Sequence, residues 1–384
     1  MSLPIVKPGE VGLDARRLGV ADGIVRAGQE SGVYPAAVLL VARHGKIAHH
    51  AAFGTLKPGG ADCRPDSIFD LASLTKPHTA LGLLTLVEDG RVALAQEVRE
   101  FLPEAKDSPV GALTIRQLAT HTSGLPAWKP LYKSGLADQT LPLMNLAKAP
   151  ILKEAHVFIL REILATPLHH PPNTKYMYSD LGYMLIGEIV SRASGMSLDQ
   201  YLHARIFAPL GMKDTGYRPA PTMHGRIAAT SNSALQGKNI TVGAVHDENA
   251  FVLGEVSGHA GLFGTAPDLA IVGSALAGSG EILGHRVIGI PTLRLVRENQ
   301  TDPAIGGHSI GWFTPPNSML PRGDILPDST FGHTGFTGTM LVCEPKNELV
   351  VVLLTNRVVN PADNGGIARI RRRVLNAVAS AVVK

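Results

Sequence analysis

Apolar segments with the character of β-strands lie near both ends of this chain. Residues 36–42 (AAVLLVA) are apolar and partly β-branched, and a short turn separates them from a returning segment at 47–53. Toward the other end, side chains alternate with the two-residue period of a strand at 308–313, 338–343 and 349–354. Helical patterns occupy the long region between. This order predicts an α+β fold of the α/β-sandwich type, in which an antiparallel sheet built from both termini is flanked by helices.

The helical patterns in the middle of the chain predict an inserted unit. We expect residues 1–70 and 286–384 to form the sheet domain and residues 71–285 to form a mostly helical domain, with the active site at their junction. A chain of 384 residues is long enough to bury a substantial core in this arrangement. The expected helices fall at 14–30, 71–90, 181–195, 198–207, 265–277 and 367–378.

Composition excludes several classes of protein. With 45% hydrophobic and 18% charged residues, the chain has an ordinary globular composition and resembles neither a disordered chain nor a coiled coil. The net charge of +4 comes from scattered basic residues without interleaved aromatic ones, so we expect no nucleic-acid partner. No stretch reaches the roughly 18 apolar residues of a membrane span, and no signal peptide is visible. The default location is therefore cytoplasmic, or periplasmic or secreted if a leader has been trimmed, and the oligomeric state stays open.

Metal and disulfide chemistry have little support in the sequence. Fifteen histidines occur, but no His-Glu-x-x-His or Cys-x-x-Cys pattern accompanies them. The run His246-Asp247-Glu248-Asn249 has ligand-like side chains, yet such a run is more often a hydrogen-bonded loop near a domain seam, and its role stays open. Two cysteines, at 63 and 343, cannot form a disulfide framework, although a single bridge stays open. We expect neither a metal nor another cofactor.

A serine and a lysine three positions apart, Ser73 and Lys76, form the pattern Ser-x-x-Lys. On a helix the two side chains lie on one face, so the Lys76 ammonium can sit beside the Ser73 hydroxyl. A serine hydroxyl is a weak nucleophile until a base takes its proton, and a desolvated lysine of lowered pKa can do so near neutral pH. The spacing occurs about once by chance in a chain of this length. Its purely structural interpretation is a capping serine followed by a solvated lysine, so the pattern needs support elsewhere.

Tyr178 and Asp180 lie just before the expected helix at 181–195. The structural interpretation is that Ser179 or Asp180 caps this helix. The functional interpretation is that Tyr178 relays a proton, while Asp180 returns to the same side and holds Lys76 charged and oriented. Both interpretations apply in part.

The segment His333-Thr334-Gly335-Phe336 leads into the expected strand at 338–343. It is either a glycine-rich turn or the edge of an active site. In the functional interpretation, the backbone N–H of Phe336 points at a substrate carbonyl, and His333 and Thr334 supply polar contacts. Gly335 then allows a close approach of the backbone.

A second serine motif matches a catalytic pattern but lacks the structural context that the pattern requires. Residues 307–311 (GHSIG) match Gly-x-Ser-x-Gly, the nucleophile elbow of α/β-hydrolases, but that motif requires a strand, a sharp turn and then a helix. Two prolines at 315 and 316 forbid a helix here. We therefore do not expect Ser309 to be a nucleophile.

Three motifs together resemble a known superfamily. SLTK at 73–76, YSD at 178–180 and HTG at 333–335 follow the order of the three motifs of the serine β-lactamases and penicillin-binding proteins. The chain looks most similar to class C β-lactamases and to the β-lactamase-like carboxylesterases, and segments 114–126 and 258–265 look like further signatures of the family. The resemblance covers essentially the whole chain from about Pro35.

The resemblance implies roles for individual residues. By similarity, Ser73 is the acylated nucleophile, Lys76 with Tyr178 activates it, and the N–H groups of Ser73 and Phe336 form an oxyanion hole. Which of Lys76 and Tyr178 is the general base stays open, because coupled groups need not have separable pKa values. The resemblance also implies a sheet domain from both termini, a helical domain between them and a site at their junction.

Two residues depart from the pattern of the family's β-lactamases, which usually carry Asn in place of Asp180 and Lys in place of His333. Asp180 adds a negative charge that favours a protonated Lys76, so we expect Lys76 to act mainly as a charged partner that lowers the pKa of Tyr178. His333 titrates near pH 6.5 and is a poor permanent clamp for a substrate carboxylate. Both departures argue against an efficient β-lactamase.

The sequence therefore predicts a cofactor-free serine hydrolase that acts through an acyl-enzyme on small esters or amides. One alternative is a β-lactamase or a D-amino-acid peptidase or carboxypeptidase on cell-wall fragments. A second is a non-catalytic binding or scaffold protein of the same fold.

Overall fold

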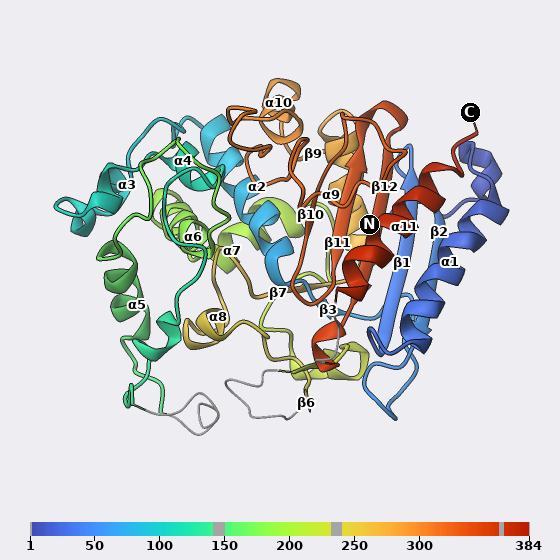
Figure 1. Cartoon of the computed structure of the whole chain (residues 1–384), viewed down its shortest axis with the longest axis horizontal. Coiled ribbons are helices and arrows are strands. Elements are labelled where there is room, and N and C mark those ends of the chain that lie inside the picture. The colour runs from blue at the N-terminus through green and yellow to red at the C-terminus, as the bar shows by residue number, and fades with distance from the viewer. Residues whose placement is uncertain (1, 141–149, 232–239, 361–364, 384) are drawn as a thin grey trace.

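The computed structural model describes residues 2–140, 150–231, 240–360 and 365–383 (Figure 1). In Figure 1 the sheet and the helices that cover it occupy one half of the molecule, and the helices from the middle of the chain occupy the other. None of the helices within the described residues is both long and apolar enough to cross a membrane.

A five-stranded antiparallel sheet draws its strands from both ends of the chain. The pairing of the N-terminal hairpin with the C-terminal strands places Leu39 opposite Leu353. This confirms the predicted α+β fold with a sheet from both termini. In spatial order the strands are β10 (Phe331–Thr334), β11 (Met340–Glu344), β12 (Leu349–Thr355), β1 (Ala36–Arg43) and β2 (Lys46–Gly54).

Helices cover both faces of this sheet, so β1 and β12 are buried along their whole length. On one face, α1 (Ala15–Glu30) and α11 (Gly366–Ala379) pack against each other, and on the other α9 (Ala266–Ala277) contacts β1, β11 and β12 (Figure 1). Alternate side chains of β1 divide between the two cores: Leu39 joins the core under α1 and α11, and Leu40 joins the opposite one. Each such buried leucine contributes about 2 kcal/mol to stability.

The helices from the middle of the chain are organised around α2 (Thr75–Glu88), which packs against α6 (Asp180–Ser194) and α7 (Leu198–Leu202). α2 is buried on nearly every side, in agreement with its apolar sequence. The domain boundaries at 70/71 and 285/286 stay a prediction. The remaining helices here are α3 (Val98–Phe101), α4 (Ile115–Ala119), α5 (Ala155–Leu164), α8 (Glu248–Val252) and α10 (Ile290–Arg297).

Short strands connect the two halves. β3 (Phe69–Asp70) and β4 (Gly216–Tyr217) pair with opposite edges of β7 (Leu262–Gly264), and β3 carries the chain directly into the turn that bears Ser73. Two further pairs are β5 (Thr230–Ser231) with β6 (Ile240–Thr241) and β8 (Glu281–Ile282) with β9 (His285–Arg286).

The structure differs from two local expectations and answers one question that the sequence left open. Residues 308–313 form isolated bridges and not a strand, because Gly311 has a positive φ of 91° and the N–H of Ser309 turns back to the carbonyl of Trp312. The helix expected at 71–90 begins as the 3₁₀ turn Ala72–Leu74 and becomes α-helical at Thr75. The two cysteines are both free and buried, so the single disulfide that the sequence left open does not form.

Candidate active site

Ser73 lies in a tight turn between β3 and α2. Ala72, just before it, has a positive φ of 48°, which is uncommon for a residue with a side chain. The carboxylate of Asp70 stabilises this turn, because its Oδ1 accepts the N–H of Ala72 at 2.8 Å. The hydroxyl of Ser73 is thereby held at the entrance of α2 and stays partly exposed.

Lys76 points from the first turn of α2 at the hydroxyl of Ser73. Its ammonium donates to Ser73 Oγ at 2.9 Å and to the carbonyl of His259 at 3.1 Å, and it forms an ion pair with Asp180 Oδ1 at 2.7 Å. The Lys76 side chain is 1% exposed. An ammonium has three N–H donors; two of them are hydrogen-bonded here, and the ion pair with Asp180 adds a third polar contact.

Tyr178 lies beside this pair and is half-buried. Lys76 Nζ is 4.8 Å from the centroid of its ring. Burial raises the pKa of Tyr178 well above its usual value, and the charge of Asp180 adds to this, although a hydrogen bond with Ser73 acts in the opposite direction. The net direction for Tyr178 is upward, and the expectation that Lys76 lowers this pKa stays a prediction.

Asp180 is the first residue of α6, and Ser179 is the cap, as its hydroxyl accepts the N–H of Gly182 at 3.4 Å. The carboxylate of Asp180 turns back toward Lys76, as the functional interpretation of the sequence expects. Ser179 thus takes the structural role and Asp180 lies next to the lysine, while the proton relay by Tyr178 stays a prediction.

His333 is not placed against the candidate substrate space. On β10 its ring is fully buried and stacks on Phe313, with centroids 4.3 Å apart, while Nδ1 hydrogen-bonds the carbonyl of Thr334 at 2.9 Å. Burial holds the pKa of His333 well below its usual value, and the charge of Lys76 lowers it further. His333 is therefore a neutral packing residue, and the expectation that it titrates near pH 6.5 is wrong.

The turn that follows β10 does reach the site. Phe336 is 61% exposed and lines the cavity described below, whereas Thr334 is half-buried and does not. Gly335 lies so close to the nucleophile segment that a Cβ would come within 2.5 Å of the carbonyl oxygen of Leu71 and 2.1 Å of Thr339 Oγ1. This agrees with the close approach expected of that glycine.

Hydrogen bonds fasten this turn to the segment before Ser73. The hydroxyls of Thr337 and Thr339 donate to the carbonyls of Asp70 and Leu71, at 2.8 and 3.0 Å. From α11, Arg371 donates to the carbonyls of Gly335 and Thr339. The two segments that carry the backbone N–H groups of Ser73 and Phe336 are consequently fixed relative to each other.

A third segment, 245–259, completes the site and was not assigned by sequence reasoning. The N–H of His246 donates to Asp70 Oδ2 at 2.7 Å, and the ring of His246 stacks on Phe336 at 5.5 Å. His259 Nε2 hydrogen-bonds Asp247 Oδ1 at 2.9 Å, and its Nδ1 hydrogen-bonds Ser257 Oγ at 2.8 Å. A sequence signal existed for each partner, since the signature at 258–265 contains His259 and the polar run at 246–249 contains Asp247, but none indicated that the two residues pair.

Burial and charge shift the pKa values of two carboxylates of the site, Asp70 and Asp247, in opposite directions. Burial raises the pKa of Asp70 to about 7, against the lowering effect of its two backbone N–H donors. Burial alone would also raise the pKa of Asp247, but the charge of His259 and the hydrogen bond with it lower that pKa to about 2. Asp247 is therefore ionised at every ordinary pH, and Asp70 changes its charge near neutrality.

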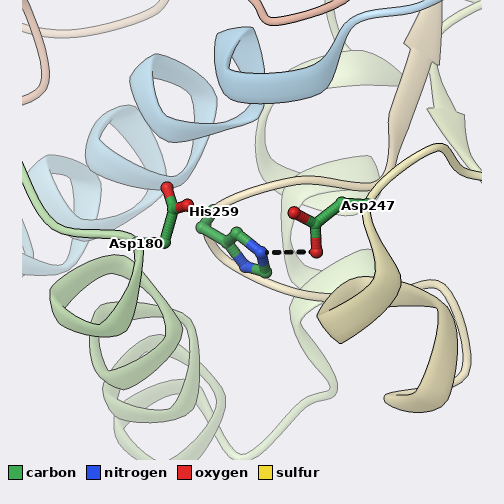
Figure 2. A group of neighbouring side chains, drawn as sticks. All are labelled: Asp180, Asp247 and His259. Carbon is green, nitrogen blue, oxygen red and sulfur yellow. Dashed lines mark hydrogen bonds and ion pairs between the residues drawn. The ribbon is translucent and has the colours of Figure 1, made fainter. Parts of the chain in front are cut away.

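Among the residues that the structure describes, one group has possible ligand atoms close enough together for a metal ion, within 4.8 Å of one another (Figure 2). It consists of Asp180, Asp247 and His259. Figure 2 shows that the ring of His259 turns to Asp247, while the carboxylate of Asp180 points elsewhere. The ammonium of Lys76 lies 2.7 Å from that carboxylate and would repel a second cation. This arrangement does not fit a metal ion.

These segments enclose a cavity of about 400 Å³ with Ser73 in its wall. Its lining combines the hydroxyl of Ser73 with an aromatic rim and three carboxylates. The lining residues are Ala72, Ser73, Trp128, Tyr178, Asp180, His246, Asp247, Glu248, Ala260 and Phe336. The size and the mixed lining suit a small-molecule substrate.

Comparisons with known proteins agree with this geometry. A family model described as beta-lactamase matches residues 21–376. A curated protein of Salmonella enteritidis PT4 (strain P125109), named "Putative D-alanyl-D-alanine carboxypeptidase", is 31% identical and covers 94% of this chain and 88% of its own length.

Two solved structures illustrate the likeness in fold. EstCE1, described as a hydrolase with promiscuous acyltransferase activity, is 20% identical with a TM-score of 0.71, over 94% of this chain and 99% of its own. A class C beta lactamase from Rhodobacter sphaeroides is 21% identical with a TM-score of 0.70, over 95% of this chain and 100% of its own.

Proposed function

The chain belongs to the beta-lactamase family of serine hydrolases, and on that basis we propose that it hydrolyses small esters or amides through an acyl-enzyme on Ser73. The observation that carries the proposal is the contact of Lys76 Nζ with Ser73 Oγ at 2.9 Å, at the wall of the 400 Å³ cavity. An amine beside a hydroxyl is the arrangement that nucleophilic catalysis by serine needs.

In the proposed reaction, Ser73 Oγ attacks the substrate carbonyl as its proton passes to the Lys76–Tyr178 pair. The carbonyl oxygen becomes an oxyanion, which the backbone N–H groups of Ser73 and Phe336 stabilise. The C–O or C–N bond then breaks, and the leaving group takes the proton from the same pair. Water enters and reverses these steps to release the acid and restore Ser73.

The resting protonation state sets a pH dependence. Lys76 is ion-paired with Asp180, and burial raises the pKa of Tyr178, so the phenol of this pair holds a proton before the reaction. One proton must leave this group before Ser73 can be deprotonated. The rate of acylation is therefore expected to rise with pH above neutrality.

The test is covalent labelling followed by a substrate panel. A fluorophosphonate is expected to add one mass increment to the protein, on the peptide that contains Ser73, and p-nitrophenyl acetate is expected to turn over. A label on any other serine would contradict the assignment. Labelling of Ser73 without turnover of any ester, β-lactam or D-alanyl peptide would favour the binding or scaffold alternative.

A second candidate function is a D-alanyl-D-alanine carboxypeptidase, which the name of the curated relatives favours. That activity, like β-lactam hydrolysis, requires recognition of a substrate carboxylate. In this chain the residue at the corresponding motif position, His333, is buried and neutral. We therefore expect short-chain esters to be turned over far better than a chromogenic cephalosporin or a D-Ala-D-Ala peptide, and the reverse ranking would favour the second candidate.

A further inference from the structure

We propose that the cavity at Ser73 selects substrates that carry a positive charge, such as an ammonium group, close to the bond that is broken, and that it disfavours carboxylates. This inference rests on the proposed hydrolase function and names the substrate class of the same site. It differs from what the name of the curated relatives implies for those proteins, since a C-terminal D-alanine carries a carboxylate.

The charges around the cavity carry the inference. Three carboxylates line it, those of Asp180, Asp247 and Glu248. The Lys76 ammonium balances Asp180 at 2.7 Å, and His259 partners Asp247 at 2.9 Å. Glu248 is bonded to its own backbone N–H, and within the part of the chain that the structure describes no cation pairs with it.

Glu248 is the residue best placed to meet a substrate cation. It is the first residue of α8, half-buried, and opens onto the same cavity as Ser73. Burial raises the pKa of Glu248, and the charge of Asp247 raises it further. A carboxylate that is partly desolvated and lacks a cationic partner is stabilised more strongly by an incoming cation than a solvated carboxylate is.

The cations near the site are engaged elsewhere. The guanidinium of Arg357 lies over the ring of Phe336 at 4.7 Å, and its Nε donates to the carbonyl of Phe336 at 2.6 Å. Arg371 donates to the carbonyls of Gly335 and Thr339. Neither arginine lines the cavity. A substrate carboxylate there would therefore meet the carboxylate side chains of the protein.

An aromatic wall adds to this preference. Trp128 lines the cavity and is 45% exposed. The face of an indole ring attracts cations, quaternary ammonium groups included. A cavity that offers both an indole and an unpaired carboxylate favours an ammonium group over a neutral group of the same shape.

A matched set of thioesters tests the inference. Acetylthiocholine, its neutral carbon isostere 3,3-dimethylbutyl thioacetate and 3-(acetylthio)propionate share one acyl group, and all release a thiol that one reagent detects. A parallel set of p-nitroanilides of alanine, propionic acid and succinic acid places the charge on the acyl side. We expect kcat/KM for the cationic member of at least one set to exceed that of the neutral member by about tenfold. The anionic members are expected to rank last, and the advantage is expected to shrink in 0.5 M NaCl because salt screens the field.

The variant Glu248→Gln keeps the size of the side chain and removes its charge. It is expected to lower kcat/KM for the cationic thioester more than that for the neutral thioester, so that the cation-to-neutral ratio falls several-fold. Glu281→Gln is the matched control, because Glu281 is exposed on β8, away from the cavity, and its loss changes the net charge equally. The control is expected to leave the ratio unchanged.

Failure of the inference is distinct from failure of the proposed function. If neutral thioesters turn over and the anionic members rank first, or charge has no effect, the charge preference is overturned while the hydrolase stands. An anionic preference that Arg357→Gln abolishes would identify that arginine as a carboxylate anchor and overturn the inference in the same way. If no member turns over and a fluorophosphonate leaves Ser73 unlabelled, both proposals fall.

Discussion

Two serine motifs of this chain have opposite environments. At Ser73 the hydroxyl faces a cavity and meets the ammonium of Lys76 at 2.9 Å. At Ser309 the hydroxyl is fully buried and donates to the carbonyls of Val296 and Trp312, at 2.5 and 3.4 Å. One serine has a lysine beside it and open space in front, whereas the other satisfies backbone acceptors.

The difference shows what separates a reactive serine from a structural one. A buried hydroxyl that bonds a carbonyl contributes about 1 kcal/mol to stability and has no access to substrate. Around Ser73, beside Lys76, lie three groups whose pKa is shifted by burial or charge, namely Tyr178, Asp70 and Asp247. Such clustering of perturbed groups in a cavity is typical of active sites.

The strongest test of this contrast is to remove each hydroxyl in turn. Ser73→Ala is expected to reduce kcat/KM for p-nitrophenyl acetate by about 10³-fold or more, because no nucleophile remains. Ser309→Ala is expected to retain activity within about twofold and to lower the free energy of unfolding by about 1 kcal/mol. Initial rates and thermal unfolding of both variants measure this. Equal activity of Ser73→Ala and the parent would remove the basis of the mechanism.

The next largest effect is expected for the lysine. Lys76→Met keeps most of the buried stem and removes the amine, so acylation loses a proton acceptor. The expected fall in kcat is about 10²- to 10⁴-fold. Stopped-flow acylation and circular dichroism separate this loss from misfolding. A folded Lys76→Met protein with parental acylation rates would leave Tyr178 as a sufficient base.

Asp70 tests whether the nucleophile turn depends on charge. Above a pKa of about 7 its carboxylate accepts the N–H groups of Ala72 and His246, and protonation below that pH removes one of these bonds. Activity is therefore expected to rise with pH through about 7. Asp70→Asn is expected to lower kcat/KM by about tenfold and to remove this part of the pH profile. An unchanged profile in the variant would assign the titration to another group.

The same carboxylate is expected to affect stability in the opposite sense. Its pKa in the folded protein, about 7, is higher than its value in the unfolded chain, about 4. Between these values the folded state binds more protons, so the contribution of Asp70 to stability falls as pH rises from about 4 to 7. Melting temperatures of the parent and of Asp70→Asn across this range measure the difference.

The smallest expected effect concerns the turn after β10. Gly335→Ala would push a methyl group against Leu71 and Thr339, at an expected cost of about 1 to 3 kcal/mol. Because this turn carries Phe336, kcat is expected to fall as well. Gly9→Ala is the control, since a Cβ there meets nothing within 4 Å. A Gly335→Ala protein as stable and active as the control would contradict the close packing of the two segments.

Much of the architecture follows from local sequence patterns. The N-terminal hairpin, α1, α6, α9 and the last two strands lie where periodicity and capping residues predict them. The prediction of a strand at 308–313 was wrong because alternation describes the side chains and not the backbone, and Gly311 turns the chain there. A two-residue period with a glycine inside is thus a weak indication of a strand.

The candidate site was less accessible to sequence reasoning than the fold. Ser73, Lys76, Tyr178 and Asp180 meet as their spacing and resemblance suggested. The burial of His333 could not be inferred, because it depends on a partner, Phe313, from another part of the chain. The same holds for Asp70, because the second N–H group that its carboxylate accepts belongs to His246, 176 positions later. Interactions between distant segments decide which polar residue faces substrate.

The pairing of β1 with β12 has a consequence for the order of events during synthesis. The N–H of Ala36 bonds the side chain of Asn356, which lies 320 positions later. Contacts of such long range form late and slow folding. A growing chain that already contains Ser73 and Lys76 lacks the turn at Phe336 until the last strands have emerged. The proposed site is therefore expected to stay incomplete on the ribosome and to form only when the two ends of the protein meet.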